Sequence, residues 1–144
     1  MGEVVIHLLR KGEEGVLARL APGVFDKSID AGLLAEFLDD PRHHLALAID
    51  DGLVVGMASG VDYVNPDKPR ELWINEVGVA ASHRQLGLAS RLLEALFAEG
   101  RARGCWQAWV LTNRSNAAAM RLYAGAGGRL DAHDTAMFTV DLRT

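Results

Sequence analysis

The chain has 144 residues, of which 49% are hydrophobic and 24% charged, a composition typical of one folded domain rather than of a disordered chain. No apolar run approaches the ~20 residues that span a bilayer, the start at Met1 lacks the features of a signal peptide, and the single cysteine, Cys105, suits a reducing compartment. A net charge of −4 disfavours nucleic acid and favours a cationic partner. We therefore expect one domain over residues 1–144, in the cytoplasm, with no membrane or nucleic-acid partner.

The first half of the chain predicts strands that pair with their sequence neighbours. β-Branched and apolar residues predict strands over 3–9, 44–49 and 53–63, and apolar residues at helical spacing predict helices over 13–20 and 31–39. The Asp51-Gly52 pair between two of these strands is a strong hairpin signal. An antiparallel arrangement is expected for this half.

The second half alternates strands and helices. Strands are predicted over 71–79, 105–111 and 136–142, with a long helix that ends near Gly104 and a shorter helix over 117–124. A helix that connects two strands of one sheet usually makes them parallel. The whole order predicts an α+β fold whose mixed sheet is antiparallel first and then closed by a crossover.

An anion site is predicted where the strand over 71–79 meets the long helix. After a polar turn, Arg84-Gln85-Leu86-Gly87-Leu88-Ala89 opens that helix. The first backbone N–H groups of a helix have no intrahelical partner and lie at the positive end of its dipole. Gly87 and Ala89 lack the bulk that would keep a ligand away, and Arg84 adds a full positive charge. We expect this turn to bind the pyrophosphate of a coenzyme.

Two common phosphate loops do not fit this turn. The P-loop requires a lysine directly after its last glycine, and Leu88 follows Gly87. The dinucleotide fingerprint requires glycines where Ala89 and Leu92 stand. The remaining pattern, Arg/Gln-x-x-Gly-x-Gly/Ala between a strand and a helix, resembles the acetyl-CoA signature of the GCN5-related N-acetyltransferase (GNAT) superfamily. The resemblance implies that acetyl-CoA is bound by Arg84, Gln85, Leu86, Gly87, Leu88 and Ala89.

A second motif, Asn116-x-x-Ala119-x-x-Leu122-Tyr123 followed by Gly127, resembles the last helix of GNAT enzymes. Asn116, Ala119 and Tyr123 share one helix face. By resemblance, Tyr123 is the general acid toward the sulfur of CoA, and Asn116 and Ala119 contact the coenzyme. A phenol with a pKa near ~10 is a plausible proton donor to a departing thiolate. The alternative is that Tyr123 is simply a core aromatic residue.

The resemblance also implies the GNAT fold: a mixed sheet of six to seven strands, about four helices and a splayed parallel pair of strands. In that fold the strand before the turn offers backbone groups to the coenzyme. By resemblance these belong to Val77, Gly78 and Val79, and the N–H of Val79 polarises the acetyl carbonyl.

Glu76 is the candidate general base, because only a neutral amine attacks a thioester and the reaction needs a group to take its proton. The strand pattern surrounds Glu76 with apolar residues such as Ile74 and Val77. A carboxylate in such company needs a partner or a raised pKa, which suits a base. The alternative is an edge carboxylate paired with Arg70 or Arg129.

A narrower resemblance concerns the acceptor. Val64-x-Pro66-x-x-Pro69-Arg70-Glu71-x-x-Ile74-x-Glu76, followed by His83-Arg84, and the later Met137-Phe138-x-x-Asp141, are similar to aminoglycoside 3-N-acetyltransferase type I enzymes, which have Asp where this chain has Glu76. The amino-terminal third departs from that family. The resemblance implies a polycationic acceptor with a 3-amino group. Carboxylates should line its site, and the candidates are Asp26, Glu71, Glu76 and Asp141.

Other interpretations stay open at this level. The scattered acids fit a solvated face, the acceptor could be another small amine or a peptide amine, and the chain could be a CoA-binding sensor domain without catalysis. Five histidines show no metal-ligand spacing, so no metal is expected. A homodimer is possible, since this fold commonly dimerises, but no sequence feature decides it.

Overall fold

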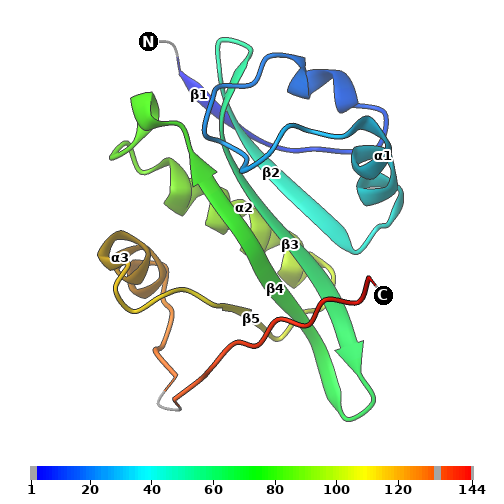
Figure 1. The fold of residues 1–144 in the computed structure, drawn as a ribbon, viewed down its shortest axis with the longest axis vertical. Coiled ribbons are helices and arrows are strands. Elements are labelled where there is room, and N and C mark those ends of the chain that lie inside the picture. Colours follow the sequence, from blue (N-terminus) through cyan, green and yellow to red (C-terminus); the bar gives the residue numbers. More distant parts are fainter. Residues whose placement is uncertain (1–2, 132–133, 144) are drawn as a thin grey trace.

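A computed structural model describes residues 3–131 and 134–143 of the chain and contains one five-stranded sheet in the order β1-β2-β3-β4-β5 (Figure 1). The elements in chain order are β1 (Val4–Leu8), the 3₁₀ helix η1 (Glu14–Ala18), α1 (Ala31–Asp39), β2 (His43–Asp50), β3 (Leu53–Asn65), β4 (Lys68–Val79), the 3₁₀ helix η2 (Ala81–His83), α2 (Leu88–Ala102), β5 (Gln107–Val110) and α3 (Ala117–Gly125).

The sheet is antiparallel in its first four strands and parallel at its end. Each of the pairs β1–β2, β2–β3 and β3–β4 is antiparallel, whereas β4 and β5 run parallel because α2 connects them. This confirms the predicted α+β fold, with an antiparallel first half and a parallel pair. The predicted hairpin turn is also present, and both of its residues, Asp51 and Gly52, have positive φ.

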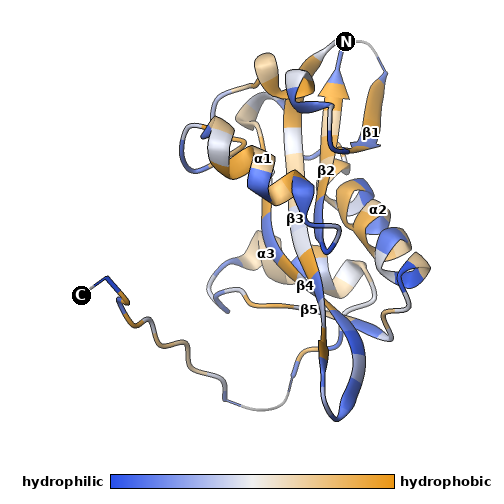
Figure 2. Cartoon of the chain, turned by 90° about the vertical axis from the view of Figure 1, so that its right-hand side faces the viewer, coloured by the Kyte–Doolittle hydropathy of each residue, from blue (hydrophilic) through white to orange (hydrophobic). Residues whose placement is uncertain are grey.

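The main core lies between the sheet and α2. Leu92, Leu93 and Leu96 of α2 are completely buried against strand residues such as Val54 and Leu72. Each such leucine contributes about 1.5–3 kcal/mol to folding by removal from water. On the opposite face of the sheet lies α1, which is capped as expected by Asp30, whose Oδ1 accepts from Leu33 N at 2.9 Å (Figure 2).

A buried carboxylate ties the end of α2 to the sheet. Asp62 of β3 is fully enclosed and accepts from Arg103 Nε at 2.5 Å, from Arg70 Nη1 at 2.6 Å and bonds His44 Nε2 at 2.6 Å. Burial raises the pKa of Asp62, but the bonds from Arg103, His44 and Arg70 outweigh it and leave the pKa below its ordinary value. Asp62 therefore serves the fold, because its carboxylate is enclosed by these three partners.

The predicted count of about four helices was too high by one. The segment expected to form a helix over 13–20 contains only the short 3₁₀ helix η1. The chain after it is extended because it pairs with β3: Ala21 N donates to Val54 O and Val54 N donates to Arg19 O. Tertiary pairing thus overrides the local helical pattern, and the described residues contain three α-helices.

The predicted count of six to seven strands was also too high. Residues 136–142 form no strand in the described part of the chain, although their sequence alternates as a strand should. Figure 2 shows the carboxyl-terminal segment leaving the body of the molecule, so no neighbouring strand satisfies its backbone there. Among the described residues, no helix is both long and apolar enough to cross a membrane.

Candidate active site

The parallel strands β4 and β5 separate along their length. Their pairing covers only Glu71–Ile74 against Gln107–Val110, whereas β4 continues to Val79 and is paired there with β3 alone. The backbone of Val77, Gly78 and Val79 consequently offers one unpaired side toward the space from which β5 has diverged. This is the splay expected from the sequence, and it leaves peptide N–H and C=O groups available to a ligand.

The turn between β4 and α2 presents helix donors without a cap. Gly87 is the N-cap residue of α2, has φ of 75° in the left-handed region, and provides no side-chain cap. A side chain at Gly87 would point into open space, since no atom lies within 4 Å of the position of its Cβ. The first N–H groups of α2 therefore remain free for an anion. A pyrophosphate fits this turn.

The same turn is fastened to the sheet by side chains. His83 is buried, and its Nε2 lies 2.7 Å from Asp50 Oδ2 of β2, while its Nδ1 lies 2.7 Å from Ser82 Oγ. Arg84 Nε donates to Val79 O at 3.3 Å, so its guanidinium lies at the end of β4. Gln85 has a φ of 64°, unusual for a residue that is not glycine. Strain of this kind persists where the surroundings hold it, and it gathers at ligand sites.

Tyr123 lies on α3, beside the diverging strands β4 and β5. It is half-buried and lines a small cavity of about 70 Å³ between the sheet, α2 and α3. Other walls of that cavity are formed by Ile74, Phe97, Ala108, Trp109, Val110 and Gly128. Burial raises the pKa of Tyr123 above its ordinary value, so the phenol stays protonated at neutral pH.

Asn116 has a structural role of its own. It is the N-cap of α3, and its Oδ1 accepts from Ala119 N at 3.0 Å. This bond fixes the start of the helix that carries Ala119 and Tyr123, and it occupies the Asn116 oxygen.

Glu76 is exposed, contrary to the expectation that apolar neighbours enclose it. Glu76 pairs with Ser59 and Ile74 pairs with the next β3 residue, Gly60, so Asn75 is an extra residue in β4. This β-bulge turns Glu76 away from the helix-covered side, where Ile74 is buried. Arg70, one of the two arginines considered as an ion-pair partner of Glu76, donates to Asp62 instead.

A polar and aromatic cluster occupies the same side of the sheet as Glu76. Glu71 is buried and accepts from Gln107 Nε2 and, at 3.4 Å, from Tyr63 Oη. Trp109 Nε1 donates to Tyr63 Oη, and the ring of Trp109 stacks on Trp73 with centroids 5.6 Å apart. We call these five residues the aromatic-acid cluster. Sequence reasoning found Glu71 but missed Tyr63 and Gln107, because only strand register brings them to it.

Asp26 and Asp141, the two other predicted substrate ligands, lie in different surroundings. Asp26 is exposed in the loop before α1, and the backbone of the nearby Val24 contacts Gly78 so closely that a Cβ on Gly78 would collide with it. That loop therefore borders the splayed half of β4. Asp141 lies on the carboxyl-terminal segment and binds Arg143 at 2.8 Å. The structure brings Glu71 and Glu76 to one face of the sheet and leaves Asp141 apart.

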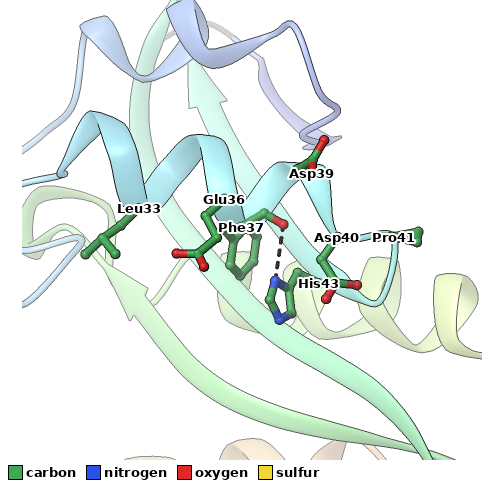
Figure 3. A pocket seen from close by; sticks show the side chains of 7 residues that line it. All are labelled: Leu33, Glu36, Phe37, Asp39, Asp40, Pro41 and His43. Carbon is green, nitrogen blue, oxygen red and sulfur yellow. Dashed lines mark hydrogen bonds between the residues drawn. The ribbon is translucent and has the colours of Figure 1, made fainter.

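A larger pocket of about 650 Å³ lies between α1 and the start of β2 (Figure 3). Two of the three acids that line it are already paired, Asp39 with Lys11 at 2.5 Å and Asp40 with Arg42 at 2.8 Å, and Glu36 is the third. His43 stacks on the ring of Phe37, and its Nδ1 bonds the Phe37 carbonyl oxygen. A pocket in which two of three acids are neutralised is poorly suited to a polycation. Within the described residues, no group of three or more His, Cys, Asp or Glu side chains could hold a metal ion.

Comparison with known proteins agrees with this geometry. Residues 14–127 match the acetyltransferase (GNAT) family. An uncharacterized N-acetyltransferase of Mycobacterium tuberculosis is 26% identical over 106 residues, which cover 74% of this chain and 65% of the relative. The match thus spans about two thirds of the length of that relative.

Solved structures share the fold at lower identity. An aminoglycoside acetyltransferase from an uncultured soil metagenomic sample, in complex with trehalose, has a TM-score of 0.80 at 15% identity, with 97% of each chain covered. The aminoglycoside acetyltransferase AAC(6')-Iy, in complex with the bisubstrate analogue CoA-S-monomethyl-acetylneamine, has a TM-score of 0.76 at 20% identity, with 97% of this chain and 99% of that chain covered.

Proposed function

This chain belongs to the GNAT acetyltransferase family, and from that premise we propose that it transfers the acetyl group of acetyl-CoA to an amine of an aminoglycoside. The observation that carries the coenzyme part is the splay of β4 from β5 beside the uncapped turn at Gly87. Unpaired strand backbone suits the amide groups of a pantetheine arm, and the free helix N–H groups suit a pyrophosphate.

The residues that would hold acetyl-CoA come from three elements. Val77, Gly78 and Val79 would bond the pantetheine arm, and the turn from Arg84 to Ala89 would bond the phosphates. Asn116 and Ala119 lie on α3, the helix that carries Tyr123, and would border the same arm. Acetyl-CoA supplies the activated acetyl group as a thioester.

Glu76 and Tyr123 would divide the proton transfers between them. The amine nitrogen forms a bond to the acetyl carbon, and the bond from that carbon to sulfur breaks. Glu76, exposed on the open face, takes the proton that the amine loses, directly or through water. Tyr123 donates its phenol proton to the sulfur, and its raised pKa keeps that proton in place until it is needed.

The acceptor is inferred from the face on which Glu76 lies. Glu71 and Glu76 add two carboxylates to this face, and Asp26 lies in the loop that borders it. Trp109 and Tyr63 provide aromatic surface, on which a sugar ring or an ammonium group can lie. A polycationic aminocyclitol combines both features. The sequence resemblance favours its 3-amino group, whereas one neighbour of the same fold is named as a 6'-enzyme.

The experiment is a thiol-release assay with acetyl-CoA against aminoglycosides, polyamines and peptides, followed by NMR assignment of the acetylated nitrogen. Turnover of aminoglycosides supports the proposal, and the NMR assignment distinguishes the 3-amino from the 6'-amino product. Turnover limited to polyamines or peptides would replace the acceptor and keep the reaction. Binding of CoA without turnover of any amine would favour a sensor domain instead.

A further inference from the structure

A small apolar cavity lies at the point where β4 and β5 begin to separate. The last residues that pair between the two strands are Ile74 and Val110, and both line the cavity of about 70 Å³ beside Tyr123. Leu93 and Phe97 of α2 line it as well. The interiors of folded proteins contain few voids larger than a water molecule. A void at the start of the splay is therefore a candidate for part of a ligand.

The wall of this cavity is made mainly of hydrocarbon. None of the described residues that line it is charged, and the indole N–H of Trp109 already donates to Tyr63 Oη. The polar side-chain group that remains is the phenol of Tyr123. A buried water needs about two to four polar partners, so a cavity with this wall suits an apolar group better than water.

Two walls of the cavity are held in place by contacts within the protein. Gly128 N donates to Tyr123 O at 2.9 Å, and a Cβ on Gly128 would come within 2.6 Å of that oxygen. On the other side, the ring of Trp109 stacks on Trp73. These contacts fix the backbone of Tyr123 and the ring of Trp109, so neither wall depends on a ligand for its position.

We propose that this cavity takes the hydrocarbon tail of an acyl-CoA, so that the protein transfers propionyl and butyryl groups as well as acetyl. This inference rests on the proposed function, in which Tyr123 donates its proton to the sulfur of the coenzyme. The acyl carbon is bonded to that sulfur, so the tail begins beside Tyr123. An acetyl group has a single methyl group and would leave most of the cavity empty.

The bond changes are the same for each acyl group. The nitrogen of the amine forms a bond to the acyl carbon, and the bond from that carbon to sulfur breaks. The sulfur leaves with the proton of Tyr123, and Glu76 takes the proton that the amine loses. A longer tail changes only what lies in the cavity.

The volume of the cavity limits the length of the tail. An apolar cavity of about 150 Å³ holds benzene, which has six carbon atoms. A cavity of about 70 Å³ therefore has room for about three carbon atoms. Butyryl adds two carbons to acetyl and fits this room, whereas hexanoyl adds four and exceeds it.

Calorimetric titration of the full chain with a series of acyl-CoA thioesters tests the tail site without any acceptor. Burial of one methylene strengthens binding about fourfold. Propionyl-CoA should therefore bind about fourfold, and butyryl-CoA about 15-fold, more tightly than acetyl-CoA. Hexanoyl-CoA should bind more weakly than butyryl-CoA. Equal affinities across the series would overturn the inference, and so would a rise that continues through hexanoyl-CoA.

Ala126→Leu should fill the cavity, because leucine adds three carbons at a residue that lines it. The affinity for butyryl-CoA relative to acetyl-CoA should fall by about tenfold or more. Ala124→Leu makes the same change at an exposed position of α3 outside the cavity and should keep the ratio of the wild type. Equal ratios in the two variants would contradict the assignment of the cavity.

Val110→Ala makes the opposite change and keeps the test decisive if Ala126→Leu does not fold. It removes two carbons from the wall, so the thioester that binds most tightly should shift from butyryl-CoA to a longer one such as hexanoyl-CoA. Circular dichroism checks that the variant is folded. An unchanged order of affinities in folded Val110→Ala would refute the tail site.

Thiol release with an acceptor amine then measures transfer itself. The value of kcat/KM for butyryl-CoA should be at least that for acetyl-CoA, and transfer from acetyl-CoA alone would overturn the inference. If no thioester binds, the proposed function fails at its coenzyme site, and the tail site fails with it. If affinity follows chain length as expected but no amine is acylated, the proposed catalysis fails while the tail site stands.

Discussion

Glu76 of β4 lies opposite Ser59 of β3, one position out of step with the register that pairs Ile74 with Gly60. The extra residue, Asn75, therefore shifts the alternation of the side chains by one position, so the residues after it point to the opposite face from the one that an unbroken alternation would give them. Leu72 and Ile74 face the helix α2, and Glu76 joins Glu71 and Trp73 on the other face. One bulge thus places Glu76 on the face of β4 opposite the core.

Glu76→Gln should lower kcat by about 10²-fold or more, because the amide cannot take a proton from the attacking amine. The loss should be greatest at low pH, where deprotonation of the acceptor limits the rate. The pH dependence of kcat/KM from thiol release measures this. Glu94→Gln, an exposed carboxylate on α2, is the matched control. A pH profile identical to that of the wild type would exclude the base.

Tyr123→Phe should lower kcat by about 10²-fold with little change in acetyl-CoA affinity, because only the proton donor is lost. Steady-state kinetics and calorimetric titration with CoA measure the two quantities separately. The phenylalanine ring keeps the same packing beside the cavity, so the melting temperature should change little. A full kcat in this variant would leave Tyr123 as a core aromatic residue.

Gly87→Glu should abolish acetyl-CoA binding in isothermal titration, since it brings a negative charge to the free helix N–H groups. The backbone strain of a non-glycine residue at positive φ is a separate effect. Gly12→Glu controls for it, because Gly12 has a φ of 93° and open space at its Cβ but lies in another loop. Undiminished affinity in the Gly87 variant would refute the phosphate turn.

Glu71→Gln should raise the KM for a cationic acceptor while leaving acetyl-CoA affinity unchanged, because it neutralises a carboxylate on the acceptor face. The amide can keep a hydrogen bond to Tyr63, which limits the loss of stability. The measurement compares KM for an aminoglycoside with KM for a monoamine. An equal rise in KM for the aminoglycoside and for the monoamine would contradict a role in recognising a polycation.

Asp62→Asn should destabilise the protein by about 3–5 kcal/mol at neutral pH, since it leaves Arg103 and Arg70 without their buried counter-charge. Folding lowers the pKa of Asp62, so its contribution is complete above the unfolded-state pKa of about 3.9 and is lost as the pH falls through the folded-state pKa. Urea unfolding should therefore show a smaller difference in unfolding free energy between the wild type and Asp62→Asn below pH 4 than at pH 7.

The exposed pair Asp67–Lys68 provides the control for that measurement. Asp67→Asn should change the free energy of unfolding by less than about 1 kcal/mol at every pH, because surface ion pairs contribute little. A comparable loss in both variants would mean that the burial of Asp62 among its three partners is not what makes it important.

The start of α2 at Gly87 and the helix α3 could be predicted from the sequence because the signals for both are local. The small size of Gly87 and Ala89 does not depend on what the helix packs against. The order of strands and helices along the chain indicates that a helix connects β4 to β5. The same local reasoning failed at residues 13–20, where pairing of the chain with Val54 replaced a helix by an extended segment. It also failed at 136–142, because a strand pattern cannot supply the neighbour that a strand requires.

By itself, the sequence determined the fold class, the antiparallel first half, the parallel pair β4–β5 and the helix start at which a coenzyme phosphate would bind. These follow from hydrophobic period, turn residues and spacing, which act within a few residues of each other. Only the tertiary structure decided that Glu76 is exposed, that Glu71 is hydrogen-bonded to Tyr63 and Gln107, and that Asp62 is a buried carboxylate with three partners. Those outcomes depend on strand register and on one bulge, and register is set by contacts between residues far apart in the chain.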